Sequence, residues 1–265
     1  MIAVCIATYN QEAYLAQAVE SVLAQECDEP IRVFIGNDAS TDKTGSIGMR
    51  FMYQDQRVVY CSWPKNVGLV ANTLHLYSLA TEEQCAFIAM LDGDDYWTDP
   101  HKLQRQIDYL RSHPEIGLVH TGAYEEKDGK RTLLDDKAIP TGDLSEKYNL
   151  LGARQTNCTV VFRAGLLEDI PLEELKAQGF PVLDYPLYGL FSQRTQFAYL
   201  PEPTAVWRNH ESVSQPASFR KQLTYRKERI RMWRWLAICH KGHFHFRWTK
   251  AFLWYIWQIF YILFA

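Results

Sequence analysis

The segment Asp92-Gly93-Asp94-Asp95 places three carboxylates within four residues. It follows directly on Ala86–Leu91, an apolar run that is typical of a buried strand. Carboxylates this close repel one another, so the cluster is stable mainly if a cation neutralises it. Oxygen ligands suit Mg²⁺ or Mn²⁺, which keep open positions for phosphate oxygens. We therefore expect a divalent-metal site here, with a solvated acidic turn as the alternative.

Two more polar segments follow short apolar runs. In Thr8-Tyr9-Asn10, the Tyr9 ring could stack on a nucleobase or could simply pack against the protein. In the segment after Ile35, Asp38 could accept a hydrogen bond from a base or a ribose hydroxyl. The alternative for Asp38 is an N-cap of the following helix.

The segment Asn66-Val67-Gly68-Leu69 precedes another helical pattern that contains Asn72. Gly68 would allow a close backbone approach, and the N-terminus of the helix would favour a phosphate group. A turn followed by a helix cap is the alternative interpretation.

The elements that must position these residues alternate between strands and helices. Strands are predicted at Ile2–Ile6, Ile31–Ile35, Arg57–Cys61 and 86–91, with helices after Asn10 as an N-cap, from Thr41, and at Val67–Leu79. This alternation predicts a doubly wound, mostly parallel α/β sheet flanked by helices. In such sheets ligands bind beyond the carboxyl ends of the strands, where each polar segment described above lies.

The pattern is less regular further along the chain. We expect a helix over Pro100–Ser112, a strand over Ile116–His120, an irregular region over 125–150 with a turn at Asp128-Gly129, and a strand over Thr159–Phe162. Asp184–Ser192 is predicted to be helical, and Phe197–Leu200 and Ala205–Trp207 are predicted to flank a turn at 201–203. From about Ala217 the pattern is helical to Ala265.

The order and spacing of these motifs from about Ile2 to Ser214 resemble the family 2 glycosyltransferases, which have the GT-A fold. The most specific stretch is Phe87–Gln106, in which a strand, Asp-x-Asp-Asp, an aromatic pair, Asp-Pro and Lys-Leu follow in order. The resemblance implies that a nucleotide, usually uridine, contacts Ala7, Tyr9 and Asp38. It also implies that the pair Asp92 and Asp94 carries the metal. In this arrangement Asp94 binds the metal, Asp92 binds the metal or the ribose, and Asp95 supports the loop. The nucleotide-binding set expected on these grounds comprises Ala7, Tyr9, Asn10, Asp38, Asn66, Gly68, Asn72, Asp92, Gly93 and Arg208.

The same resemblance implies an inverting transfer with one general base. Asp184 has the position of that base, although Leu183 replaces the Glu that often precedes it in the family. An N-cap role is the alternative for Asp184. The segment Val206–Ser212 looks like the family's Tyr-Arg-x-His motif, which implies that His210 reaches the metal or diphosphate and that Arg208 steadies phosphate charge. A surface turn is the alternative there.

The C-terminal part is basic, whereas the rest of the chain is acidic. Residues 217–265 hold ten Lys or Arg and a single acidic residue, although the whole chain carries a net charge of −3. Interleaved Trp residues and the apolar segment Ala251–Ala265 favour a helix that lies in a membrane interface. Packing on the catalytic domain or on a second copy of the chain is the alternative. Nucleic acid is disfavoured because it would leave the apolar end unexplained.

The six cysteines have no disulfide or zinc-binding spacing, and no signal peptide is recognised, so we expect reduced thiols and a cytoplasmic protein. Altogether we expect a catalytic domain over 1–215 and a helical tail over 216–265. The expected activity is metal-dependent sugar transfer from a nucleotide-sugar, UDP by preference, to a glycan or lipid-linked acceptor at the inner face of the cell membrane. Capsule or O-antigen synthesis is the expected setting. A nucleotidyltransferase and a non-catalytic sugar-binding protein are the alternatives, but the first loop is neither Gly-rich nor basic.

Overall fold

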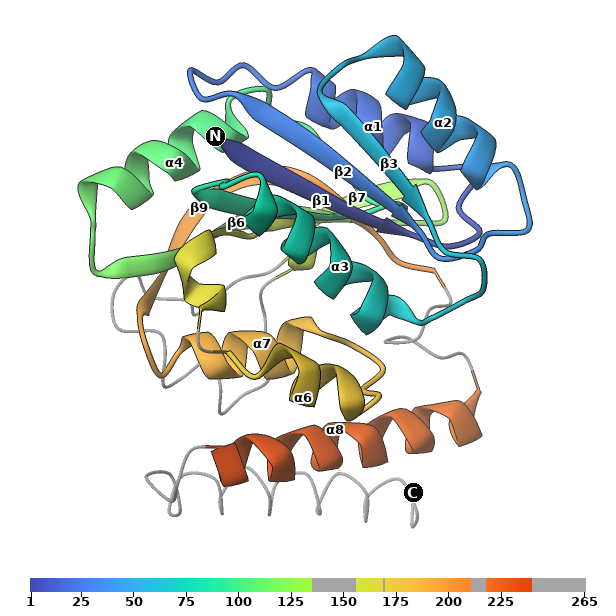
Figure 1. Cartoon of the computed structure of the whole chain (residues 1–265), viewed down its shortest axis with the longest axis vertical. Helices are drawn as coiled ribbons and strands as arrows, with labels where there is room; N and C mark the ends of the chain where they lie inside the picture. The colour runs from blue at the N-terminus through green and yellow to red at the C-terminus, as the bar shows by residue number, and fades with distance from the viewer. Residues whose placement is uncertain (135–155, 169, 211–217, 240–265) are drawn as a thin grey trace.

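The computed structural model describes residues 1–134, 156–168, 170–210 and 218–239, and shows a curled sheet with helices on both faces (Figure 1). The described strands run in the order β3-β2-β1-β4-β8-β6-β9-β5, with β7 paired to β6. Their bounds are β1 Ile2–Thr8, β2 Ile31–Asn37, β3 Val58–Ser62, β4 Phe87–Asp92, β5 Tyr96–Trp97, β6 Ile116–Lys127, β7 Lys130–Leu133, β8 Val161–Arg163 and β9 Gln196–Arg208. The predicted α/β architecture is confirmed.

Strand β1 shows why the sheet needs helices on both faces. Its residues are all buried, and their side chains alternate between two hydrophobic clusters. Ile2, Val4 and Ile6 join the cluster that also contains residues of α1, α2 and α4. The intervening Ala3, Cys5 and Ala7 join the other cluster, with residues of α3, α6, α7 and α8. The helices are α1 Leu15–Leu23, α2 Thr44–Gln54, α3 Leu69–Glu82, α4 Lys102–Ser112, α6 Leu172–Ala177, α7 Asp184–Phe191 and α8 Phe219–Cys239.

The four strands β3, β2, β1 and β4 pair in parallel, as the alternating pattern predicted. In β1 and β4, Ala7 lies opposite Asp92, so the loops after these strands leave the sheet side by side. The remaining strands mix both directions: β8 is antiparallel to β4 and β6, whereas β6 and β9 are parallel. Strand β9 of this second part ends at Arg208, whose backbone amide contacts Asp95 of the acidic segment.

Several predicted boundaries differ from the observed ones. The turn predicted at 201–203 is instead a bulge inside the continuous strand β9, where the register against β6 shifts near Gly122. Asn10 does not cap α1, which begins at Leu15 with no side-chain cap. The described part of the region predicted to be irregular, residues 125–134, is more regular than expected. Here β6 and β7 form a hairpin around the predicted turn, where Asp128 and Gly129 have φ values of 50° and 73°.

Helix α8 packs along α7 and α6 rather than standing apart from the catalytic domain (Figure 1). Met232, Trp235 and Leu236 are buried, and the Trp235 indole nitrogen donates to Glu174 Oε1 at 3.2 Å. For Trp235, the membrane interpretation is therefore wrong and packing on the domain is right.

Some features of the C-terminal part lie outside the described residues. They are the expected domain boundary at 215/216, the apolar segment 251–265, and His240, His243 and His245. No helix among the described ranges has the length and hydropathy needed to cross a membrane.

Candidate active site

The acidic segment leaves β4 against the first strand loop. The Gly93 amide donates to the Ala7 carbonyl at 3.1 Å. A Cβ atom at Gly93 would lie 2.5 Å from Gln11 Oε1 and 2.8 Å from the Thr8 side chain, so the close approach requires glycine. Gly93 therefore sets the spacing between the two loops, and its own backbone forms the contact.

Asp95 supports the loop, as the sequence analysis expected. It is 2% exposed and accepts a hydrogen bond at 2.9 Å from the Arg208 backbone amide. The Cys158 thiol is a second partner of its carboxyl group. Burial, and then the nearby Asp94 and Asp92, raise the pKa of Asp95 well above its usual range. A carboxyl group in these surroundings is suited to anchoring β9 and not to binding a ligand.

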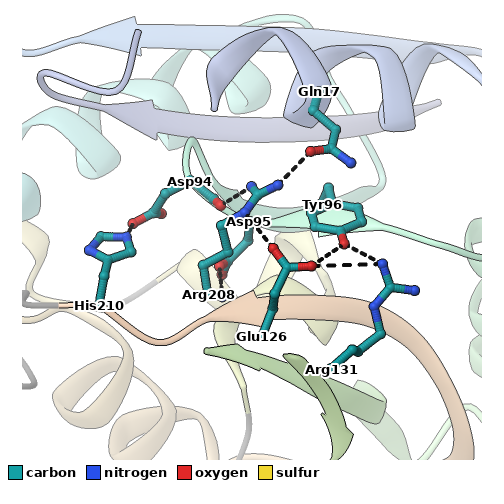
Figure 2. Close-up of polar contacts among 8 residues, drawn as sticks. All are labelled: Gln17, Asp94, Asp95, Tyr96, Glu126, Arg131, Arg208 and His210. Atoms are coloured by element: carbon teal, nitrogen blue, oxygen red, sulfur yellow. Dashed lines mark hydrogen bonds and ion pairs between the residues drawn. The ribbon is translucent and has the colours of Figure 1, made fainter. Parts of the chain in front are cut away.

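Asp94 and His210 meet at the more open side of the loop (Figure 2). His210 Nε2 lies 2.8 Å from Asp94 Oδ2, and the imidazole stacks on the Tyr14 ring at 5.8 Å between ring centres. The His210 side chain is 38% exposed and the Asp94 side chain is 17% exposed, so both remain accessible from solvent. One carboxylate and one imidazole form a ligand pair that suits Mn²⁺ when substrate phosphates supply further oxygens.

The three predicted metal ligands are not gathered into one group. Within the described residues, no three Asp, Glu, His or Cys side chains converge as a metal site. Asp94 and His210 come together, whereas both Asp92 oxygens face the Asn157 amide nitrogen at 3.3 and 3.2 Å. The pair at Asp94 therefore fits a metal that also binds substrate, and a role for Asp92 as a ligand stays a prediction.

Arg208 joins the acidic loop to β6 and α1 (Figure 2). Its Nε donates to Glu126 Oε1 at 3.2 Å, and its other nitrogens donate to the Asp94 carbonyl and to Gln17 Oε1. The guanidinium carbon lies 4.5 Å from the Tyr96 ring centre and 4.8 Å from that of Tyr14. The structure thus shows Arg208 holding the loop that bears Asp94, and the predicted phosphate contact stays a prediction.

Asp38 holds the second and third polar loops together. One carboxylate oxygen accepts the Val67 amide at 2.7 Å and the other accepts the Gly68 amide at 2.9 Å. Asn66 Nδ2 adds a longer contact of 3.3 Å to the Asp38 carbonyl. Gly68 has a φ of 88°, which favours glycine because L side chains rarely adopt it. Asp38 is 4% exposed, each of its carboxylate oxygens keeps a second lone pair, and a contact with a nucleotide stays a prediction.

Asn72 has a structural role that the sequence analysis missed. It is 1% exposed, donates to the Gly36 carbonyl at 2.7 Å and accepts from the Trp63 indole at 3.1 Å. A Cβ atom at Gly36 would lie 2.5 Å from Asn72 Oδ1, so helix α3 approaches β2 closely at this point. The predicted contact between Asn72 and a ligand is therefore poorly supported by its surroundings.

The first loop carries one exposed ring and one bridging amide. Tyr9 is 47% exposed, which leaves its ring accessible for the predicted stacking. Asn10 has a φ of 53°, accepts the Thr41 amide at 2.8 Å and donates its own amide to Ser40 Oγ at 2.9 Å. Asn10 thereby joins the first loop to the second, and this is the contact it makes in place of the predicted helix cap.

A cavity of about 290 Å³ opens beside the acidic loop on the α3 and α7 side of the sheet. Asp92 and Asp184 both line it, so the predicted base and one end of the acidic segment face the same space. Its other lining residues come from several elements: Leu69, Thr73, Tyr77, Met90, Leu134, Thr156, Asn157, Val182, Leu183, Trp207 and Tyr225. The cavity combines carboxylate, amide and aromatic groups, which is the surface needed to orient a polar ring next to a base.

Asp184 is the first residue of α7, and its carboxyl group accepts hydrogen bonds from the backbone amides of Asp184 and Tyr185. Burial raises the pKa of its carboxyl group, whereas the Tyr185 backbone amide and the charge of Arg229 act in the opposite direction. A carboxylate whose pKa is raised toward neutrality is a better proton acceptor than an exposed one. Asp184 thus contacts the first turn of α7 and also faces the cavity, and its role as the base stays a prediction.

Asn157 is a further residue of the site that sequence reasoning did not identify. Tyr188 donates its hydroxyl to Asn157 Oδ1 at 2.8 Å, while the Asn157 amide nitrogen faces Asp92. Because Tyr188 lies on α7, this chain of contacts joins the helix of Asp184 to the strand of Asp92. Burial and the nearby Asp94 raise the pKa of Asp92, whereas the contact with Asn157 lowers it.

Comparison with known proteins identifies the family of the chain. The family described as Glycosyl transferase family 2 matches residues 3–168. An uncharacterised protein of Mycobacterium tuberculosis is 35% identical over 214 residues, which cover 77% of this chain and 57% of that protein. The chain belongs to glycosyl transferase family 2.

Solved structures share the fold at low sequence identity. Staphylococcus aureus TarS in complex with UDP-GlcNAc has a TM-score of 0.61 and 16% identity, covering 95% of this chain and 74% of that one. The Pyrobaculum calidifontis mannosyltransferase PcManGT, solved with GDP-Man and Mn²⁺, has a TM-score of 0.55 and 16% identity, covering 94% and 71%. These structures show that the chain has a GT-A-like fold.

Proposed function

We propose that this glycosyltransferase moves a sugar from a nucleotide-sugar to a hydroxyl group, with inversion at the anomeric carbon. The observation that carries the proposal is the shared cavity of Asp92 and Asp184. Asp184 accepts the proton of the acceptor hydroxyl as that oxygen attacks the anomeric carbon, and the diphosphate leaves. The acceptor hydroxyl therefore belongs in the cavity, and the diphosphate belongs toward Asp94 and His210.

The nucleotide is proposed to lie over the loops after β1 and β2, where Tyr9 offers an exposed ring and Asp38 keeps lone pairs. TarS bound to UDP-GlcNAc and PcManGT bound to GDP-Man support a nucleotide-sugar donor. UDP remains our preferred nucleotide. A glycan or a lipid-linked sugar is the proposed acceptor, in the synthesis of a cell-surface polysaccharide.

A divalent metal, Mn²⁺ or Mg²⁺, is proposed to be held by Asp94 and His210, with Asp92 as a further candidate. When bound, the metal would neutralise charge on the diphosphate leaving group. Arg208 acts here by fixing the Asp94 backbone, and Asp95 acts by fixing β9. PcManGT, solved with Mn²⁺, supports this choice of metal.

Thermal stabilisation by UDP-, GDP- and dTDP-sugars with Mn²⁺ tests donor binding directly. A ligand at 100 times its Kd stabilises a folded protein by about 2.7 kcal/mol. We expect one nucleotide class to raise the melting temperature of the wild type and to lose that effect in Asp94→Ala. Asp128→Asn, in the exposed hairpin turn, is the control that keeps the effect. No stabilisation by any member of the panel would contradict the proposal.

The basic face of α8 is proposed to contact an anionic membrane surface at the cytoplasmic side. Arg220, Lys221 and Lys227 are exposed and form this face near the start of the helix, whereas Trp235 is buried in the protein. Attraction to anionic lipid is worth about 1 kcal/mol per basic residue near the surface. Co-sedimentation with phosphatidylglycerol vesicles but not with phosphatidylcholine vesicles is the expected result. A second copy of the chain is the alternative partner, and a concentration-dependent dimer without vesicle binding would favour it.

A further inference from the structure

Helix α8 is held against the catalytic domain in a fixed position. Leu236 fills the space beside Gly189 of α7, where a Cβ atom would lie 2.8 Å from Leu236 Cδ1. Arg231 donates to the carbonyls of Gln178 at 2.6 Å and Gly179 at 3.3 Å, and its guanidinium lies 4.5 Å from the Phe180 ring centre. These contacts involve backbone and buried side chains, so they determine both the depth and the register of α8.

One side of helix α8 contacts the domain at its C-terminal end and lines the cavity further toward its N-terminus. Tyr225, Arg229, Met232 and Leu236 follow one another at spacings of three or four residues, and therefore share one side of the helix. Met232 and Leu236 are buried against the domain, whereas Tyr225 lines the cavity that contains Asp184. Arg229, which lies between them, has its guanidinium carbon 5.3 Å from the ring centre of Tyr185, the neighbour of Asp184.

The charge of Arg229 matters because of what else surrounds Asp184. Asp92 on β4, Tyr77 on α3 and Tyr188 on α7 interact electrostatically with Asp184, and each is neutral or negative in its titration range. Among the described residues that act on the Asp184 carboxyl, Arg229 is the one whose positive charge favours the carboxylate form. Since a general base must be ionised before it accepts a proton, this charge has a direct consequence for transfer.

We propose that α8 is part of the catalytic site, with Tyr225 as one wall of the acceptor cavity and Arg229 as the positioning residue that supplies positive charge to Asp184. The inference rests on the proposed role of Asp184 as base. The proposal extends the catalytic unit past residue 215, because Tyr225 and Arg229 lie on α8. The expected separation into a catalytic domain and a tail is thereby replaced by a single unit that extends at least through α8.

The test compares Arg229→Gln, Arg229→Lys and Arg234→Gln in the full chain. Arg234→Gln removes the same charge from an exposed position of the same helix. The readout is the pH profile of hydrolysis of UDP-GlcNAc and of the other panel nucleotide-sugars at saturating Mn²⁺, with water as acceptor. Without Arg229 the carboxyl holds its proton to a higher pH, so the acidic limb of the profile moves upward in pH.

We expect Arg229→Gln to lose roughly tenfold in hydrolysis rate on the acidic limb and to regain most of it at high pH, since base catalysis is worth about 10²–10⁴-fold. Arg229→Lys should restore the wild-type profile in large part, and Arg234→Gln should follow the wild type. Identical profiles for Arg229→Gln and Arg234→Gln would overturn the inference. So would a loss in Arg229→Gln that is equal at every pH, because a purely structural role predicts that result.

Failure of the proposed function gives a different result. If the wild type hydrolyses no nucleotide-sugar, the Asp184 carboxyl can still be followed by ¹³C NMR, with Asp184→Asn to assign its signal. The inference then predicts a higher titration midpoint in Arg229→Gln than in Arg234→Gln. Equal midpoints would overturn the inference, whether or not the proposed activity is found.

Discussion

The loops after β1, β2 and β4 and the cavity between α3, α7 and α8 use polar residues in different ways. In the loops, Asp38, Asn72 and Arg208 direct their polar atoms to backbone groups and to other side chains. In the cavity, the Asp184 carboxyl accepts backbone amides of the first turn of α7 and faces open space together with Asp92. The loops are thus built by polar contacts within the protein, whereas the cavity leaves its reactive group available to a substrate.

This difference separates stability from chemistry. Residues whose hydrogen bonds are satisfied internally should affect folding when they are changed, because their partners are left buried and unpaired. Residues that face the cavity should affect turnover with little cost in stability. Variants in the two regions can therefore sharpen or break the comparison. The four below run from the largest expected effect to the smallest, and the last, at Lys102 of α4, lies outside both regions.

Asp184→Asn should have the largest effect on turnover. It removes the proton acceptor while keeping nearly the same shape, so donor turnover should fall by roughly 10²–10⁴-fold. The melting temperature should not fall, because the uncharged amide avoids the cost of a buried carboxylate. Steady-state turnover and thermal unfolding measure the two quantities, with Asp128→Asn as the matched control. Wild-type turnover in Asp184→Asn would remove Asp184 from the mechanism.

Asn72→Ala should have the largest effect on stability among these variants. It leaves the Gly36 carbonyl and the Trp63 indole without their partner, and each unpaired buried group costs about 1–3 kcal/mol. Asn66→Ala is the comparison, because Asn66 is exposed and makes one long contact of 3.3 Å. Urea unfolding should show a clear loss for Asn72→Ala and a small one for Asn66→Ala. Similar losses for both would mean that the loop contacts are not what stabilises this region.

Tyr188→Phe tests the link between α7 and Asp92. It removes the hydroxyl that donates to Asn157, a bond worth about 1 kcal/mol, so turnover should fall several-fold with an unchanged KM for the donor. Tyr60→Phe is a matched control away from the cavity, since the Tyr60 hydroxyl also makes one half-buried hydrogen bond, which it accepts from Asn37 Nδ2 at 2.8 Å. An equal response of kcat in both variants would show that Asn157 does not transmit the position of α7 to Asp92.

Lys102 should give the smallest effect, and only as a dependence of stability on pH. Burial lowers the pKa of Lys102 to about 7, although its Nζ lies 2.6 Å from Gln106 Oε1. Between that pKa and the ordinary value of 10.5, the unfolded chain binds more protons, so the free energy of unfolding rises with pH. The rise attributable to Lys102 is at most about 1.4 kcal/mol per pH unit.

Lys102→Met should lose this rise between pH 7.5 and pH 9, values inside the window set by the two pKa values. Urea unfolding at several pH values, with wild type and variant side by side, measures the difference. A wild-type curve that parallels that of Lys102→Met throughout this window would show that the buried amine is already charged in the folded protein.

The parallel part of the fold was predictable because its signals are local. Each of β1, β2 and β4 is a short apolar run followed by polar residues, and parallel strands bring such ends to one edge of the sheet. The acidic segment and the base were predicted from their place in the order of motifs, and the structure brings Asp92 and Asp184 to one cavity. The role of Asp95 in supporting the loop also followed from its place in the motif.

The rest depended on contacts between distant parts of the chain. The bond from Arg208 to Asp95 joins residues 113 positions apart, and no periodicity reports such a partner. Asn157 belongs to none of the motifs identified in the sequence, and Arg229 belonged to a basic run that suggested a membrane surface. The charge pattern of α8 does not determine which face of the helix is buried. The packing of Met232 and Leu236 determines this face, and therefore which residues of α8 reach the cavity.

The anomeric configuration of the first sugar product tests the central claim most directly. ¹H NMR can follow wild-type hydrolysis of the nucleotide-sugar that stabilises the protein, before the free sugar equilibrates in water. If Asp184 activates the attacking oxygen in a single displacement, an α-linked donor should release the β-anomer first. Initial release of the α-anomer would contradict the proposal that one base in this cavity carries the reaction.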